Sequence, residues 1–313
     1  MTTLNPAHPV RRRPHRSYSA IPGETPGSPP WRVLKSLILL VCVVLVLLPF
    51  LAIISTSLAD TVQVTKAGGY VMWPDHPSFG AYKALLNGGL VSRAMLISVG
   101  ITVVGTALSL FCSIMLAYGL SRPGSYGHRP VLMLLLMSML FAPGVIPSYL
   151  MIKQLHLINS YWSLILPGLI NGFNVIVLRS FFMGIPKELI DSARIDGASE
   201  WKILTRMVLP LSKASVAVIG LFYAVTYWNA FFNALLYIND AAKWPMQMVL
   251  RTYVINNAQL SGGQVDVAAG APLPPSQSLQ AAILVLSIVP IVVIYPFLQR
   301  HMNKGVMVGA VKG

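Results

Sequence analysis

Apolar blocks without charged residues alternate with short polar segments along most of the chain. A helix needs about 17–25 residues to cross a bilayer, and each block reaches that length. The pattern predicts six spanning helices, at residues 36–58, 94–120, 130–152, 161–178, 214–238 and 279–298. Prolines inside the third and fourth blocks (Pro143, Pro147 and Pro167) are expected to break or bend those helices. The expected fold class is therefore an all-α polytopic membrane protein.

The segment before the first block, residues 1–32, is rich in Pro, Ser and Arg and has no apolar periodicity. This composition predicts a disordered basic arm, followed by a transmembrane domain over residues 33–313. A signal peptide is the alternative for the first block, since Ser57–Ala59 resembles a small-residue cleavage site. However, the block exceeds the 7–15 apolar residues usual in a signal peptide, so we expect an uncleaved helix.

One long charged segment, Lys187–Pro210, interrupts the apolar pattern, and we call it the charged corner. It contains four of the nine acidic residues of the chain and four basic ones. Its apolar residues keep helical spacing in two runs with Gly197 between them, and Ser199 is placed to cap the second run. The pattern predicts two short amphipathic helices joined by a turn. Either they lie on lipid or they dock a partner protein, and the near balance of charge favours docking.

Composition supports the membrane class, because 55% of residues are hydrophobic and only 10% are charged. Soluble proteins contain about 25% charged residues. The net charge of +14 does not indicate nucleic-acid binding, since the basic residues lie in short segments between the blocks. With six spans, seventeen Lys and Arg fall on the side of the two termini and six on the other. The positive-inside rule then predicts that both termini and the charged corner are cytoplasmic.

Several kinds of chemistry are missing from the sequence. No phosphate-binding loop pattern occurs, and no predicted span contains an internal charged residue or His, which ion-driven carriers usually need. The two cysteines lie in apolar blocks and the six histidines are scattered, so no metal or catalytic cluster is expected. Residues 260–264 read LSGGQ, the signature of ATP-binding-cassette (ABC) ATPases, but without a phosphate loop we expect an accidental match. The driving energy is thus expected to come from a partner.

The charged corner resembles the cytoplasmic loop of binding-protein-dependent ABC importer permeases. Their pattern is Glu-Ala-Ala, three residues, Gly, nine residues, Ile, one residue, Leu-Pro. Here Asp191-Ser192-Ala193, Gly197, Met207 and Leu209-Pro210 keep every spacing with three mild departures. IDGAS (195–199), YWNAFFNALLYIND (227–240) and the terminal KGVMVGAVKG are similar to carbohydrate permeases of the maltose G-subunit family, in its lipoprotein-and-polysaccharide branch. The resemblance covers residues 33–313.

This resemblance implies a type I importer permease in a bacterial cytoplasmic membrane, which moves a sugar or oligosaccharide. The subunit is expected to be non-catalytic and to bind no cofactor. Its implied partners are a second, related permease, an ATPase dimer that carries ATP and Mg²⁺, and an extracellular sugar-binding protein. The C-terminal residues 305–313 would reach toward the ATPase, and Asp191 would meet a basic ATPase residue. The implied coupling residues are Glu188, Asp191, Ala193, Asp196, Gly197, Ala198, Leu209 and Pro210.

A sugar pathway needs aromatic faces and amide groups, and two predicted spans supply them. The candidates are Asn171, Asn174, Tyr227, Trp228, Asn229, Phe232 and Asn233. The alternative is that these residues anchor the membrane interface or bond neighbouring helices. Two alternatives for the function also stay open: an ABC permease for another solute, and a secondary carrier that works alone. A membrane enzyme is disfavoured, because no catalytic constellation is present.

Overall fold

The computed structural model describes residues 29–122, 124, 126–256 and 274–310, with the backbone alone for residues 29 and 297–310. The elements of this part of the chain are all helical. They are α1 (Pro29–Leu58), α2 (Thr61–Lys66), α3 (Gly80–Asn87), α4 (Leu90–Ser121), α5 (His128–Leu140), α6 (Val145–Gln154), α7 (Trp162–Ile165), η1 (Leu166–Gly168), α8 (Gly172–Met183), α9 (Lys187–Ile195), α10 (Glu200–Ile203), η2 (Leu204–Val208), α11 (Leu209–Leu211), α12 (Lys213–Trp228), α13 (Phe231–Tyr237), η3 (Ala241–Lys243), α14 (Met246–Leu250), η4 (Arg251–Ile255) and α15 (Ser276–Ala310).

The chain divides into two compact units, residues 1–50 and residues 51–313. In the first unit, the described part is the beginning of α1, which starts at Pro29. The last four residues of the predicted arm are therefore helical, because Pro suits the first turn of a helix. Residues 1–28, as well as LSGGQ at 260–264 and residues 311–313, lie outside the described residues.

Three of the predicted spans are continuous helices. The segments Pro30–Leu58, Leu90–Ser121 and Ser276–Pro296 are long and apolar enough to cross a membrane. Two further pairs of helices pass the same test only as bent pairs: Trp162–Gly168 with Gly172–Met183 at 50°, and Glu200–Leu211 with Lys213–Trp228 at 85°. By length and composition, the described residues thus hold three spans, or up to five.

The prediction of six spans is accordingly not reproduced as six unbroken helices. The block at 130–152 is divided at residues 141–144, where Gly144 has a φ of 83°, and the block at 214–238 is divided at Asn229–Ala230. Pro167 sits in the bend of the fourth block, and its missing N–H group explains the interruption. An apolar run specifies burial in lipid but not the continuity of a helix.

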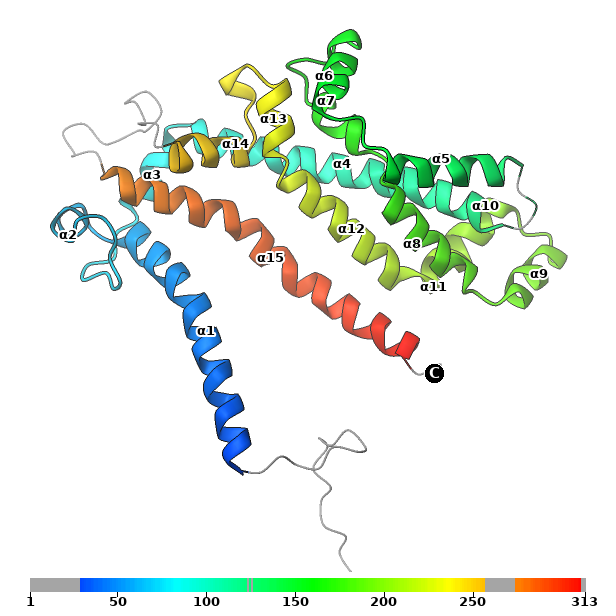
Figure 1. Ribbon diagram of the computed structural model, residues 1–313, viewed down its shortest axis with the longest axis horizontal. Coiled ribbons are helices and arrows are strands. Elements are labelled where there is room, and N and C mark those ends of the chain that lie inside the picture. The colour runs from blue at the N-terminus through cyan, green and yellow to red at the C-terminus, as the bar shows by residue number, and fades with distance from the viewer. Residues whose placement is uncertain (1–28, 123, 125, 257–273, 311–313) are drawn as a thin grey trace, which may run out of the picture. The chain divides into compact units, whose positions relative to one another are not determined.

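The core of the second unit is formed by α4, α8 and α12, which pack side by side, while α15 packs against α12 (Figure 1). Val175, Leu178 and Ile219 are fully buried in this core. Small residues allow close approach of membrane helices, and Gly105 of α4 serves this purpose. A Cβ atom there would lie 2.8 Å from Cε2 of Tyr227 on α12.

Helix α4 separates two ends of the second unit. Its 32 residues give a length of about 48 Å. Helix α3 precedes its first turn and packs with α14 and α15 around Leu85, Met246 and Ile283. The charged corner contacts its last turn, as the positions of α9 and α10 in Figure 1 show.

Candidate functional site

The charged corner folds as the sequence predicts, into two helical parts joined at Gly197. Gly197 has a φ of 75°, a left-handed conformation that glycine adopts without a steric penalty. Its N–H donates to the carbonyl of Arg194 at 3.0 Å and so closes α9. The Ser199 hydroxyl accepts from the backbone N–H of Lys202 at 3.4 Å and caps α10. The second part continues through the π-helical turn η2 into α11.

The inner face of the charged corner is anchored in the core. Ile190 of α9 and Ile203, Leu204 and Val208 of the second part are all buried. They belong to the same hydrophobic cluster as Phe182 at the end of α8. The helical parts on both sides of the turn at Gly197 are therefore packed into the same core as the long helices.

The implied coupling residues are divided between the two faces of the corner. Glu188, Asp191, Asp196, Gly197 and Pro210 are exposed, whereas Ala193, Ala198 and Leu209 are half-buried against the core. The structure thus gathers all eight on one corner, with its acidic side chains facing outward.

Two exposed apolar side chains beside the turn were not among the predicted coupling residues. Ile195 is 88% exposed and Trp201 is 59% exposed. Burying such side chains against a partner or against lipid is favourable. The sequence does contain a signal for Ile195, because it falls off the helical stripe formed by Leu189, Ile190 and Ala193.

A charged cluster on the corner centres on Glu200, which was also missed. Its Oε1 accepts from Nη2 of Arg194 at 2.7 Å and from Nε at 3.1 Å. Its Oε2 accepts from the hydroxyl of Tyr118 on α4 and lies 4.0 Å from Nε of Arg122. The Tyr118 hydrogen bond, and then the Arg194 contact, outweigh partial desolvation and hold the pKa of the Glu200 carboxyl below its usual range.

Asp191, the predicted partner of a basic ATPase residue, is more loosely held. Its side chain is 66% exposed, and its Oδ1 lies 3.9 Å from Nη1 of Arg194 one turn along α9. Exposed ion pairs of this kind contribute little. Asp191 can therefore form an ion pair with another protein at small cost.

A tyrosine seam joins α12 to α4 and to the bend before α8; it consists of Ser109, Ser113, Tyr223 and Tyr227. The Tyr227 hydroxyl bonds Ser109 at 2.8 Å and donates to the Ile165 carbonyl at 3.1 Å. The Tyr223 hydroxyl bonds Ser113 at 2.7 Å and accepts from the backbone N–H of Asn171 at 3.0 Å. Every hydroxyl of the seam thus has a partner, as buried polar groups require.

The predicted sugar-pathway residues are split between this packed interior and an exposed stretch. Tyr227 and Trp228 are each 5% exposed, and Nε1 of Trp228 donates to the Ser287 carbonyl of α15 at 3.2 Å. Asn174 is buried, and the Asn171 side chain accepts from its backbone N–H at 3.2 Å. Exposed or half-buried positions are taken by Asn171, Asn229, Phe232 and Asn233. The buried members fit the helix-bonding alternative.

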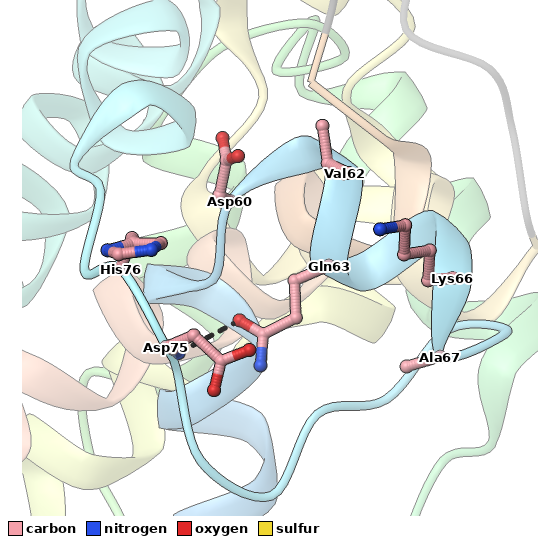
Figure 2. Close-up of a pocket in the computed structure, with 7 residues that line it drawn as sticks. All are labelled: Asp60, Val62, Gln63, Lys66, Ala67, Asp75 and His76. Carbon is pink, nitrogen blue, oxygen red and sulfur yellow. Dashed lines mark hydrogen bonds between the residues drawn. The ribbon is translucent and has the colours of Figure 1, made fainter.

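An open cavity of about 580 Å³ lies around α2. Helix α2 belongs to the second unit, at the end opposite to the charged corner (Figure 1). Figure 2 shows Gln63 directed at the following loop, where its Oε1 accepts from Asp75 N at 3.1 Å and its Nε2 donates to Trp73 O at 2.9 Å. The lining residues are Asp60, Val62, Gln63, Lys66, Ala67, Asp75 and His76. In the described residues no three His, Cys, Asp or Glu side chains form a metal site.

Comparison with known proteins identifies the family. Residues 28–308 match the family "Binding-protein-dependent transport system inner membrane component". The chain belongs to this family. It is thus a multi-pass permease component of the inner membrane and a non-catalytic subunit, and the resemblance inferred from the charged corner is confirmed.

Individual relatives are similar in sequence over nearly the whole chain. This chain is 43% identical to the polygalacturonan/rhamnogalacturonan transport system permease protein YtcP of Bacillus subtilis (strain 168), over 88% of this chain and 94% of that protein. It is 45% identical to protein LplC of the same organism, over 85% and 90%. A bacterial ABC transporter involved in the import of the acidic polysaccharide alginate superposes with a TM-score of 0.81, at 27% identity, over 90% of this chain and 99% of that chain. The all-α, type I permease fold is confirmed.

Proposed function

We propose that this permease forms half of the pathway of an ATP-driven importer of oligosaccharides, and that the charged corner receives the motion of a separate ATPase. The relatives support a sugar oligomer, since YtcP is named for polygalacturonan and rhamnogalacturonan, and the superposed transporter is involved in the import of alginate. The observation that carries the coupling role is the turn at Gly197, which is exposed but mounted on a buried base.

The distribution of charge supports a cytoplasmic position for the corner and both termini. Seventeen Lys and Arg lie on that side of the predicted topology and six on the other, which is the asymmetry of the positive-inside rule. ATP and Mg²⁺ would be bound by the ATPase, and a second permease would complete the pathway. The α2 end, at the far end of α4, would face the extracellular binding protein.

The corner is suited to transmit a rigid-body movement. Ile195 and Trp201 offer apolar area to a cleft of the ATPase, and Asp191 offers a loosely held carboxylate. Because Ile190 and Ile203 are embedded in the core, displacement of the exposed turn moves packed helices rather than a flexible loop. Small movements at such interfaces are amplified into rotations of whole domains.

Gly197→Asp tests the coupling role in the complete complex reconstituted in liposomes. The substitution adds a charge at the contact and strains a left-handed position, at about 1–2 kcal/mol. We expect sugar uptake and sugar-stimulated ATP hydrolysis to fall about tenfold or more, an energy of about 1.4 kcal/mol or above. Gly197→Ala is the matched control, because it imposes at least as much backbone strain without a charge, and it should retain more activity.

Two results would contradict the proposal. Unchanged uptake and hydrolysis in G197D would remove the coupling role of the corner. Uptake by liposomes that contain this chain alone would instead indicate a secondary carrier. The substrate class is tested separately, by uptake of labelled oligogalacturonides against an unrelated solute such as an oligopeptide; preference for the peptide would refute sugar transport.

A further inference from the structure

We propose that Glu200 is a positioning residue that fastens the charged corner to the end of α4, so that movement of the corner is passed to this span. The proposal rests on the coupling role of the corner. It assigns the connection within the permease, whereas the coupling role concerns its outer contact.

Three elements meet at the single carboxylate of Glu200. Arg194 approaches from α9 with two N–H groups on Oε1, at 2.7 and 3.1 Å. Tyr118 donates its hydroxyl to Oε2 from the last turn of α4. Glu200 itself opens α10. The carboxylate therefore joins the two helical parts of the corner to each other and both of them to α4.

The partner on α4 is firmly placed. Tyr118 is only 9% exposed and belongs to the main hydrophobic cluster. Its hydroxyl also lies 3.3 Å from the backbone carbonyl of Glu200, so it is close to both the side chain and the main chain of that residue. The guanidinium of Arg122 stacks over the Tyr118 ring at 4.4 Å, a favourable cation–π geometry.

The same turn of α4 is also bonded to α8. Nε of Arg179 donates to the Leu120 carbonyl at 2.9 Å. The end of α4 thus contacts both the corner, through Tyr118, and α8, through Leu120. Hydrogen bonds to charged groups are shorter and stronger than neutral ones, which suits a joint that must transmit force.

A simpler explanation for Glu200 is local, because acidic residues are favourable in the first turn of a helix. That explanation does not account for the observed contacts. The four-residue α10 is short, and the bonds described for the Glu200 carboxylate lead to Arg194, Tyr118 and Arg122, which all lie outside it. The contacts are those of a clamp between elements.

The experiment uses the complete transporter in liposomes with E200Q, Y118F and the double variant. E200Q keeps the shape of the side chain and removes its charge, whereas Y118F keeps every charge and removes one donor. Lys202→Gln is the control: it removes a charge from the same helix, and the described residues offer its ammonium no hydrogen bond or ion pair. We measure copurification of the ATPase, ATP hydrolysis, and sugar molecules transported per ATP hydrolysed.

We expect the ATPase to copurify with every variant, because its contact surface is unchanged. Sugar transported per ATP should fall about fivefold or more in E200Q and in Y118F, the lower end of typical coupling energies. The double variant should resemble the single ones, since both remove the same contact. A merely structural role would reduce the amount of assembled complex and leave the ratio unchanged in the complexes that remain.

Ratios in E200Q and Y118F equal to that of K202Q would overturn the positioning role. If E200Q does not assemble, Y118F alone decides, since it conserves all charges. G197D separates the two proposals. Loss of coupling in G197D together with normal E200Q and Y118F refutes only the role of Glu200, whereas normal coupling in G197D refutes the proposed function itself.

Discussion

The charged corner and the tyrosine seam both attach to α4, but they use opposite chemistry. The Glu200 side chain is 52% exposed and binds through charges. The seam is made of neutral hydroxyls, and Tyr223 and Tyr227 are 2% and 5% exposed. Charged groups are costly inside a membrane and tolerable where water reaches. This difference fits a membrane position for the seam, and under the proposed function the corner is the part of the permease that meets its partner in water.

The corner and the seam also contain two kinds of residue that sequence patterns do not distinguish. In the corner, Asp191 and Ile195 are exposed and available to a partner. In the seam, Tyr227 is already bonded to two groups of the protein. We therefore expect variants of the exposed corner residues to act on assembly and coupling, and variants of the buried residues, in the seam and on the inner face of the corner, to act on stability.

The largest effect on stability is expected from the anchored face of the corner. Ile203 is 1% exposed, and truncating such a side chain to Ala costs about 2–5 kcal/mol. Ile203→Ala should lower the unfolding free energy of the detergent-solubilised permease by that amount. Ile195→Ala is the matched control at an 88% exposed position and should change it by less than about 0.5 kcal/mol.

Ile195→Ala should nevertheless weaken copurification of the ATPase, because it removes apolar area from the proposed contact. Equal destabilisation by the two isoleucine variants would show that the corner does not have separate inner and outer faces.

A smaller loss of stability is expected at Gly105, where α4 packs closely against Tyr227 of the seam. A Cβ atom on Gly105 would lie 2.8–2.9 Å from the Tyr227 ring, and overpacking of this kind costs about 1–3 kcal/mol. Gly105→Ala should therefore lower the melting temperature. Gly119→Ala, on the same helix with no heavy atom within 4 Å of the added carbon, should not. A stable G105A would mean that α4 and α12 separate easily at this point.

The hydroxyl of Tyr227 should contribute about 1 kcal/mol, the usual net value of a hydrogen bond. Tyr227→Phe leaves the Ser109 hydroxyl and the Ile165 carbonyl without this partner. Tyr237→Phe is the control, because Tyr237 is also buried and the described contacts of its ring include stacking on Tyr149 but no bond of its hydroxyl. If Y227F lowers sugar uptake and keeps its stability, Tyr227 is a sugar contact after all.

The sequence was sufficient for features that a few neighbouring residues determine. The turn at Gly197 and the cap at Ser199 depend on local backbone geometry, and the all-α membrane class depends on apolar runs. Glu200 and Tyr118 are 82 positions apart, and Ser109 and Tyr227 are 118 apart. Such pairs are created by packing, so no local pattern predicts them.

The broken spans have a similar cause. Pro143 and Pro167 indicated that two helices would be interrupted, but not by how much. Whether the chain resumes its direction depends on the helices packed against the break, such as α12, whose Tyr223 holds Asn171 at the start of α8. The 50° bend is therefore a property of the assembled helices.

The smallest effect is expected from the titration of Glu200. Its pKa in the folded protein is lowered, chiefly by the Tyr118 hydrogen bond. A carboxyl with a lowered pKa stabilises the fold fully above its unfolded pKa of about 4.5, and this contribution is lost as the pH falls through the folded pKa. Because the side chain is half exposed, water screens the contribution to less than about 1 kcal/mol.

The melting temperature of wild-type permease should therefore exceed that of E200Q at neutral pH, and the difference should shrink as the pH is lowered below the unfolded pKa. Y118F should show a weaker version of the same trend, since it removes the largest cause of the shift. K202Q, which removes a charge outside the described contacts of Glu200, should run parallel to wild type. A constant difference between wild type and E200Q across the titration would mean that the carboxylate charge does not hold the corner, and that the corner is joined to α4 by neutral contacts, as the seam is.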